Sequence, residues 1–227
     1  MIKGVLFDFN GTLFYDSDKH VLAFQEFIRR KGLAFLSAEE IAELTFGRTN
    51  RDVFNMLYDG KASVEELDTY ALEKEADYRD ICLASPETFK LADGVCEMFD
   101  WLKEHNIPFN IATGSGIENV EFYYKEFGLG KWLSFDTVVY NDNTLKGKPE
   151  PDFYIEAAKR IGLVPSECIV FEDALSGFLS ASSAGAGAIY ALLSPNDDSL
   201  LTGGVHIDGE IKNFCGYLDI FKKHGLA

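Results

Sequence analysis

Carboxylates stand at the end of two short apolar runs in this sequence. One run ends at Asp8, and another ends at the adjacent pair Glu172 and Asp173. A carboxylate that leaves a buried strand is costly unless a cation or a chemical role compensates its charge, and two adjacent acids raise that cost. Mg²⁺ prefers carboxylates, waters and phosphate oxygens as ligands, so the pattern indicates a Mg²⁺ site. A strand that simply ends in solvent is the alternative.

A hydroxyl and a lysine accompany these acids. Thr113 ends a further apolar run, and Gly114 follows it before a helical pattern whose first N–H groups form a ready anion site. The alternative is that Thr113 and Ser115 only cap that helix. Lys148 precedes Pro149 in a loop that the proline stiffens, so its charge can be aimed at a phosphate. A solvated loop lysine is the alternative.

The pair Asn10-Gly11 favours two different structures. An Asn-Gly pair between alternating hydrophobic residues is the strongest local signal for a two-residue β-hairpin. It can also form a turn that carries Asp8 out of the first strand. The complementary groups at the ends of the other runs favour the second reading, because ligands bind outside the carboxyl ends of strands in open α/β sheets.

Apolar runs that predict strands alternate with helical patterns. The strands are expected at Gly4–Phe9, Phe109–Thr113, Thr137–Tyr140, Cys168–Phe171 and Ala188–Leu192. The helices between them are expected at Val95–His105, Ile117–Phe127, Asp152–Ile161 and Ser176–Ala184. This order predicts the α/β class, with a Rossmann-like parallel sheet core and helices on both faces.

An insertion of helical character interrupts this alternation after the first strand. From Asp16 to Pro86 the sequence shows four helical patterns, and capping-box signatures begin two of them, Ser37 with Glu40 and Ser63 with Glu66. We expect a helical cap domain at 16–86 and a core domain made of 1–15 and 87–227. In the tail, a loop is expected at 194–204 and a last helix at 214–223.

The motifs together resemble a known family. The segments are Asp8-x-Asn10-Gly11-Thr12-Leu13, Gly147-Lys148-Pro149-x-Pro151-Asp152 and Glu172-Asp173-x-x-x-Gly177. They are similar to motifs of the haloacid dehalogenase superfamily, in the branch that includes β-phosphoglucomutase and small phosphatases with a helical cap. The resemblance covers the chain from Gly4 to Leu192.

The resemblance implies a role for each motif residue. Asp8 matches the nucleophile, which forms an aspartyl phosphate. Thr113 and Gly114 match the groups that bind a phosphoryl oxygen, and Lys148 matches the cation that steadies the nucleophile and the transferring group. The implied Mg²⁺ ligands are Asp8, the carbonyl of Asn10, Glu172 and Asp173. The implied activity is Mg²⁺-dependent hydrolysis of a small phosphorylated metabolite.

The cap residues follow from the same resemblance. The loop Phe46–Asp52 occupies the place that reads the leaving group of the substrate, and its candidate substrate residues are Arg48, Asn50 and Arg51. The two arginines could meet a second anionic group. Arginines at this spacing more often pair with surface acids. His20 falls where a mutase carries a His near the hinge.

Asn10 departs from the family pattern. Phosphatases and mutases of the family carry Asp here, as a general acid and base, and an amide cannot exchange a proton. General acid–base catalysis is worth roughly 10²–10⁴ in rate, so slow hydrolysis is expected. A catalytically silent phosphate- and metal-binding protein is one alternative, and a phosphotransferase like β-phosphoglucomutase is another if Asn10 is an engineered change. The loop 47–52 has no lysine, which counts against a phosphonoacetaldehyde hydrolase.

Composition limits the partners. Acids outnumber bases by 37 to 21, which gives a net charge of −16 and disfavours nucleic acid and anionic membranes. The four scattered cysteines and the absence of an export signal predict reduced, mostly buried thiols in a cytoplasmic protein. A dinucleotide site at Gly114-x-Gly116 is disfavoured, because Asn119 stands where the third glycine of the fingerprint belongs. The oligomeric state is open.

Overall fold

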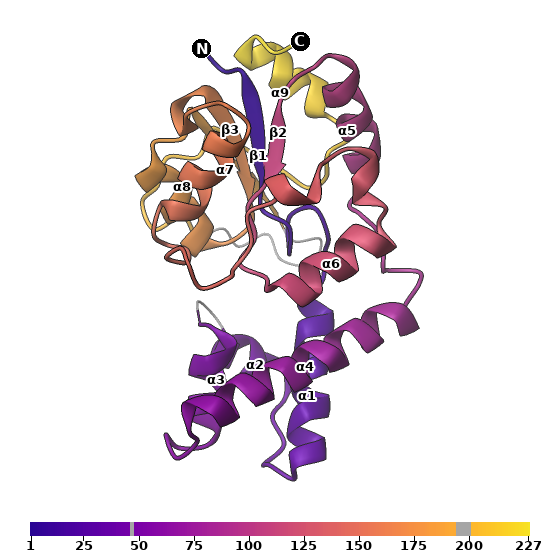
Figure 1. The fold of residues 1–227 in the computed structure, drawn as a ribbon, viewed down its shortest axis with the longest axis vertical. Coiled ribbons are helices and arrows are strands. Elements are labelled where there is room, and N and C mark those ends of the chain that lie inside the picture. Colours follow the sequence, from indigo (N-terminus) through magenta and orange to yellow (C-terminus); the bar gives the residue numbers. More distant parts are fainter. Residues whose placement is uncertain (46–47, 194–200) are drawn as a thin grey trace. The chain divides into compact units, whose positions relative to one another are not determined.

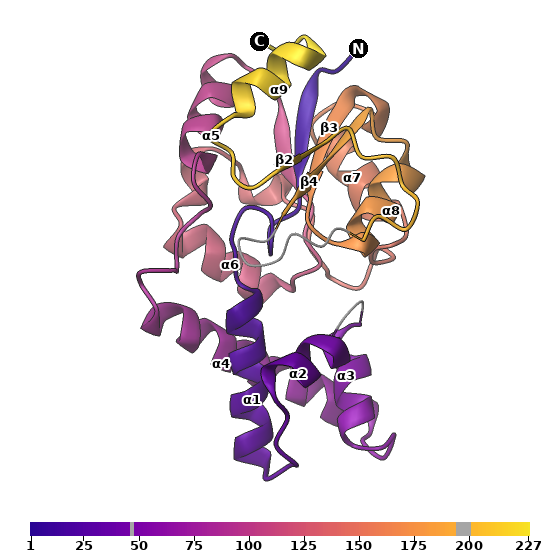
Figure 2. The same ribbon diagram turned by 180° about the vertical axis from the view of Figure 1, so that it is seen from behind.

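A five-stranded parallel sheet forms the centre of the larger unit. The computed structural model describes residues 1–45, 48–193 and 201–227. The strands are β1 (Gly4–Phe7), β2 (Phe109–Ile111), β3 (Cys168–Glu172), β4 (Ala188–Leu192) and β5 (Gly209–Ile211). They lie in the order β2-β1-β3-β4-β5, and every neighbouring pair is parallel (Figures 1 and 2). The α/β class expected from the sequence is confirmed.

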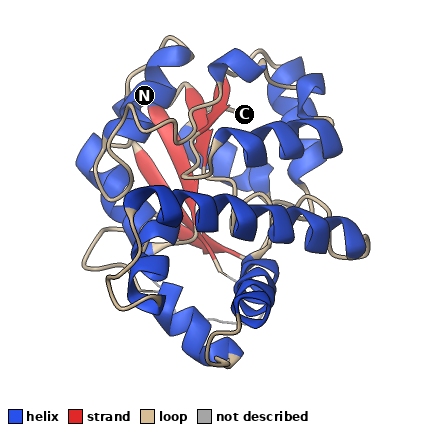
Figure 3. Ribbon diagram, turned by 60° about the horizontal axis from the view of Figure 1, so that its bottom comes forward, coloured by secondary structure: helices blue, strands red, loops and turns tan. Residues whose placement is uncertain are grey.

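Helices cover both faces of this sheet (Figure 3). The helices of the larger unit are α5 (Val95–Glu104), α6 (Ile117–Glu126), α7 (Asp152–Arg160), α8 (Leu175–Ala184) and α9 (Tyr217–His224). Successive strand residues point to opposite faces. Leu6 and Val170 therefore pack with Phe153 of α7 and Phe178 of α8 in one cluster of fully buried side chains. On the opposite face the ring of Phe7 lies 5.4 Å from Phe99 of α5.

One strand prediction was wrong, and one strand was missed. Thr137–Tyr140 is not a strand. Its first residue belongs to a 3₁₀ turn (Phe135–Thr137), and among the described residues a single bridge, from Val139 to Ala112, joins the segment to the sheet. The strand β5 was not predicted, because it lies between the loop expected at 194–204 and the helix expected at 214–223. Its three residues, Gly-Glu-Ile, are short and only partly buried, so they carry none of the continuous apolar character that marks the buried strands.

The Asn10-Gly11 pair forms a turn that leaves β1, and no hairpin follows within the described residues. Phe14 donates its N–H to the carbonyl of Phe9, and Gly11 donates its N–H to the carbonyl of Phe14 at 2.7 Å. The chain then enters the helical insertion. The turn therefore carries Asp8 to the carboxyl edge of the sheet.

The helical insertion is a second compact unit, residues Asp16–Phe89; the first unit is Met1–Tyr15 with Lys90–Ala227. Its helices are α1 (Ser17–Lys31), α2 (Ala38–Thr45), α3 (Asn50–Leu57) and α4 (Val64–Ala84). Both expected capping boxes are present: Ser37 with Glu40 and Ser63 with Glu66 exchange backbone and side-chain hydrogen bonds. An aromatic core that includes Phe27 and Phe54, with ring centroids 4.6 Å apart, holds the helices together.

Parts of two expected loops lie outside the described residues. These are Phe46 and Gly47 of the leaving-group loop and residues 194–200 of the tail. The cysteines are all free thiols, of which Cys82 and Cys168 are buried and Cys96 and Cys215 are exposed, so burial is less complete than expected. Within the described ranges, no helix is both long enough and apolar enough to span a membrane.

Candidate active site

Carboxylates from two neighbouring strands converge at the carboxyl edge of the sheet. Asp8 directly follows β1, and Glu172 and Asp173 stand at the end of β3. Phe7 pairs in register with Phe171, and the N–H of Asp8 donates to the carbonyl of Phe171 at 3.0 Å. One oxygen atom from each of the three carboxylates lies within 4.8 Å of the others. Parallel pairing of β1 and β3 thus joins segments that are far apart in the sequence.

Lys148 supplies the positive charge at this cluster. Its Nζ donates to Oδ1 of Asp8 at 2.6 Å and also pairs with Oε1 of Glu172, and its side chain is only 10% exposed. Burial alone would lower the pKa of Lys148, but the charges of Asp8 and Glu172 outweigh burial and raise the pKa above its ordinary value. Lys148 is therefore a fixed cation beside the Asp8 carboxylate.

Backbone and side-chain donors fix the carboxylate of Glu172. Its Oε2 accepts the N–H groups of Asp173 at 2.9 Å and Ala174 at 3.1 Å, and its Oε1 accepts the hydroxyl of Tyr154 at 3.0 Å. A Cβ atom at Gly177 would lie 1.8 Å from Oε1. Because Gly177 of the third motif has no side chain, it leaves the space that the Glu172 carboxylate occupies.

This contact predicts the effect of a single methyl group. Gly177→Ala should lower the free energy of unfolding by about 1–3 kcal/mol, because the buried carboxylate cannot yield without losing its donors. Gly216→Ala is the matched control, since a Cβ there meets no atom within 4 Å. Urea denaturation of both variants measures the difference, and equal stabilities would contradict the prediction.

Asp173 is held close to the turn at Gly11. Thr12 donates its hydroxyl to Oδ1 of Asp173 at 3.0 Å, and a Cβ at Gly11, where φ is +80°, would lie 2.1 Å from Oδ2. Burial, and then the negative charges of Glu172 and Asp8, raise the pKa of Asp173 well above that of an ordinary carboxyl. An added cation would oppose that rise, so this set of hard oxygen donors fits a divalent metal ion.

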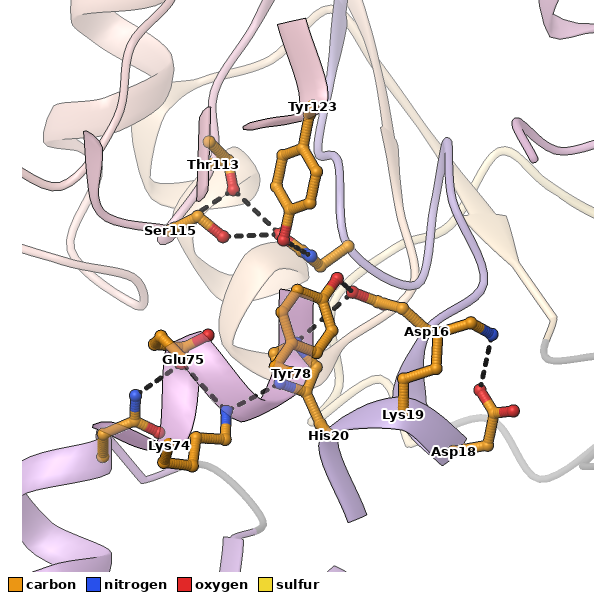
Figure 4. A network of polar contacts seen from close by, with 12 residues as sticks. Asp16, Asp18, Lys19, His20, Lys74, Glu75, Tyr78, Thr113, Ser115 and Tyr123 are labelled. Carbon is orange, nitrogen blue, oxygen red and sulfur yellow. Dashed lines mark hydrogen bonds and ion pairs between the residues drawn. The ribbon is translucent and has the colours of Figure 1, made fainter. Parts of the chain in front are cut away.

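Hydroxyl groups surround the side chain of Asn10. Its Oδ1 accepts the hydroxyls of Ser115 at 2.8 Å and Thr113 at 3.2 Å, and its Nδ2 donates to the hydroxyl of Tyr123 at 2.8 Å. Figure 4 shows these three hydroxyls directed toward one point. A Cβ at Gly114 would meet no atom within 4 Å, so the backbone beside Thr113 faces open space. Asn10 and Thr113 are thus joined directly.

The helical unit holds a polar cluster of its own (Figure 4). His20 contacts Nζ of Lys74 through Nδ1 at 2.7 Å and Asp16 through Nε2 at 3.3 Å. Lys74 donates to Glu75 at 2.8 Å, and Asn50 donates to the same carboxylate oxygen at 2.7 Å. His20 and Asn50, both named from the sequence, are therefore connected through Lys74 and Glu75.

The two arginines are not joined to this polar cluster by the described contacts. Arg51 pairs with Asp68. Arg48 donates to the carbonyls of Glu43 at 3.0 Å and Leu44 at 2.9 Å. Arg51 therefore pairs with a surface acid, which is the more common arrangement for arginines at this spacing.

Sequence reasoning missed several contacting residues. Tyr154 and Tyr123 lie on α7 and α6 at positions that look like ordinary core positions of amphipathic helices. Ser115 was expected at most to cap the helix that follows, and its hydroxyl instead contacts Asn10. Lys74 is 1% exposed, and a sequence gives no sign that one lysine among many is buried.

Comparison with known proteins identifies the family of this fold and site. Residues 2–185 match the model of the haloacid dehalogenase-like hydrolases. Hexitol phosphatase A of Escherichia coli is 31% identical over 195 residues, covering 86% of this chain and 85% of that protein. Fructose-1-phosphate phosphatase of the same organism is 31% identical over 188 residues, covering 82% of this chain and 94% of the relative.

A solved structure agrees with these sequence relatives. The HAD hydrolase, family IA, variant 3, from Entamoeba histolytica is 39% identical, covers 94% of this chain and 94% of its own, and superposes with a TM-score of 0.86. The family model spans the acidic cluster, the lysine and the helical insertion alike. The chain belongs to the haloacid dehalogenase-like hydrolase family.

Proposed function

We propose that the protein is a Mg²⁺-dependent phosphatase of a small phosphorylated metabolite and that it works through an aspartyl-phosphate intermediate at Asp8. The observation that supports this most directly is the Asp8 carboxylate, which lies against the Lys148 ammonium at 2.6 Å and close to two further carboxylates. The names of the relatives, a hexitol phosphatase and a fructose-1-phosphate phosphatase, favour a sugar or polyol phosphate as the substrate class.

The metal site of this proposal uses Asp8, Asp173 and the backbone carbonyl of Asn10. Glu172 already accepts hydrogen bonds from Lys148 and Tyr154, so it supplies charge beside the metal and positions its neighbours. Bound Mg²⁺ would neutralise the charge that builds up when a carboxylate approaches a phosphate. The raised pKa of Asp173 supports the assignment, because a bound cation would offset the cost of burying its charge beside Glu172 and Asp8.

The chain's own residues carry the chemical steps. An oxygen of Asp8 attacks phosphorus, a P–O bond forms, and the bond to the leaving-group oxygen breaks. Lys148 stabilises the negative charge of both partners, and Thr113 with the N–H of Gly114 donates to a phosphoryl oxygen. Water then hydrolyses the acyl phosphate and restores Asp8.

Asn10 makes the departure of the leaving group the difficult step. Its amide can donate a hydrogen bond to the leaving oxygen but cannot transfer a proton. Esters whose alcohol leaves readily as an anion should therefore turn over faster than alkyl esters. Retention of the phosphate site without turnover, as in a binding protein, is the second candidate function, and Asn10 is the observation that favours it.

We assign substrate selection to the helical unit. The connected polar groups of His20, Lys74, Glu75 and Asn50 offer both donors and acceptors of the kind that sugar hydroxyls need. A role for Arg48 and Arg51 in binding a second anionic group stays a prediction.

A panel of phosphate esters tests the proposed function. With Mg²⁺, the protein should release phosphate from aryl phosphates and, more slowly, from sugar phosphates, and excess EDTA should abolish release until Mg²⁺ is restored. If no ester is hydrolysed while calorimetry shows Mg²⁺-linked phosphate binding, the binding function is correct. If neither turnover nor binding is found, both candidate functions fail.

A further inference from the structure

The hydroxyl of Tyr123 is a fixed point in the core of the larger unit. The side chain belongs to α6 and is only 1% exposed. Its ring stacks on Phe9 at a centroid distance of 4.5 Å and an angle of 19°, and the ring of Phe14 meets it edge-on at 6.3 Å. A fully buried ring with these contacts cannot carry its oxygen elsewhere without opening the core. The oxygen that faces Asn10 is therefore held in place.

The surrounding hydrogen bonds set the direction of the Asn10 amide. Thr113 already accepts the N–H of Ser115 at its Oγ1, at 3.1 Å, so its own hydrogen is left for donation. The amide accordingly presents Oδ1 to Thr113 and Ser115 and Nδ2 to Tyr123. Reversing the amide would take the acceptor Oδ1 away from Thr113 and Ser115 and turn the NH₂ group toward them.

This arrangement determines where the single hydrogen of the Thr113 hydroxyl goes. A threonine hydroxyl has one hydrogen to donate, and here Oδ1 of Asn10 receives it at 3.2 Å. In the function proposed above, the same hydrogen is donated to a phosphoryl oxygen. Asn10 and an incoming phosphate therefore compete for one donor.

We propose that Tyr123 is a positioning residue that holds the Asn10 amide against Thr113 and thereby sets the affinity of the site for phosphate. This inference rests on the proposed function, in which Thr113 binds a phosphoryl oxygen. Removing only the hydroxyl of Tyr123 takes away the acceptor that Nδ2 contacts at 2.8 Å. The partly buried amide is then held less firmly in this orientation, its hold on Thr113 weakens, and phosphate obtains the Thr113 hydrogen at a lower cost.

Phosphate binding with matched variants tests the effect on affinity. Tyr123→Phe keeps the ring that stacks on Phe9, so the core is preserved. Tyr124→Phe is the control, because Tyr124 is the next residue of the same helix and donates to the carbonyl of Leu133 instead. In calorimetry with saturating Mg²⁺ and inorganic phosphate, Tyr123→Phe should lower Kd about two- to tenfold, the change that one neutral hydrogen bond corresponds to. Tyr124→Phe should leave Kd unchanged.

The kinetic constants separate positioning from a general structural effect. In Tyr123→Phe, KM for an aryl phosphate should fall while kcat does not rise, because Asp8 and Lys148 are untouched. A Kd that is unchanged, or that shifts equally in Tyr124→Phe, would overturn the effect on phosphate affinity.

The amide itself gives a readout that does not depend on phosphate. The side-chain NH₂ signals of Asn10 in ¹H–¹⁵N spectra can be assigned by their loss in Asn10→Asp. Tyr123→Phe should shift these signals and speed their exchange with solvent, and Tyr124→Phe should not. Unchanged signals in Tyr123→Phe would overturn the inference. If the signals move as expected but no variant binds phosphate, the proposed function fails and the positioning of Asn10 by Tyr123 stands.

Discussion

Asp8→Asn should reduce phosphate release by on the order of 10⁴-fold or more, to the background of the assay. Loss of the attacking group removes the covalent route entirely, and nucleophile deletions in enzymes that use such a route cost factors of this size or larger. The substitution keeps the volume of the side chain, and Lys148 keeps its partner Glu172. The variant should therefore fold, and near-UV circular dichroism can check this.

Asp219→Asn is the control for that loss. Its side chain lies on α9 and is 91% exposed, so removing its charge should leave turnover unchanged. Rapid quench of the wild type with a ³²P-labelled ester should in addition trap an acid-stable, base-labile phosphoprotein that Asp8→Asn does not form. Turnover that survives in Asp8→Asn would reject the aspartyl-phosphate route.

Asn10→Asp should raise hydrolysis by roughly 10²–10⁴-fold, because it provides a group that can give a proton to the leaving oxygen and take one from water. The gain should be larger for sugar phosphates than for aryl phosphates, since an alkoxide needs its proton as the bond breaks. The hydroxyls of Ser115 and Thr113 can donate to a carboxylate as they do to the amide, so the variant has partners for its new charge.

Initial rates on one alkyl and one aryl phosphate measure this gain. Asn10 precedes Gly11, and Asn-Gly pairs deamidate, so mass spectrometry of the peptide that contains Asn10 must accompany each rate. A wild type free of deamidation that matches the variant on alkyl phosphates would show that another residue carries the proton. No gain on either ester would favour a site built for binding.

The sequence predicted the acidic cluster because parallel sheets collect the ends of their strands at one edge. Asp8, Glu172 and Lys148 could be named because each stands just after a buried strand or before a helix, where a charge without a role is costly. Their pairing at 2.6 Å between Lys148 and Asp8 follows from that topology. What the pattern could not provide was the order of the strands, which decides which acids meet.

The tyrosines that contact Asn10 and Glu172 could not be predicted from the sequence, for a physical reason. Tyr123 and Tyr154 are buried through their rings, so their place in a helix follows the apolar periodicity and their hydroxyls leave no trace in it. The polar cluster around Lys74 joins side chains from three helices of the insertion, and no local pattern encodes that meeting. Tertiary packing, and not local propensity, determines these contacts.

The parallel register of β1 has a consequence for how the protein is made on the ribosome. The strand Gly4–Phe7 is flanked on one side by Phe109–Ile111 and on the other by Cys168–Glu172. Of these three strands β1 is synthesised first, and nearly half of the 227 residues are made before its first neighbour, with about a further quarter before its second. The helices of 16–89 make their contacts locally and need no such wait. During that interval an apolar segment stays without its partners, which makes the nascent chain a natural client for chaperones until the third strand leaves the exit tunnel.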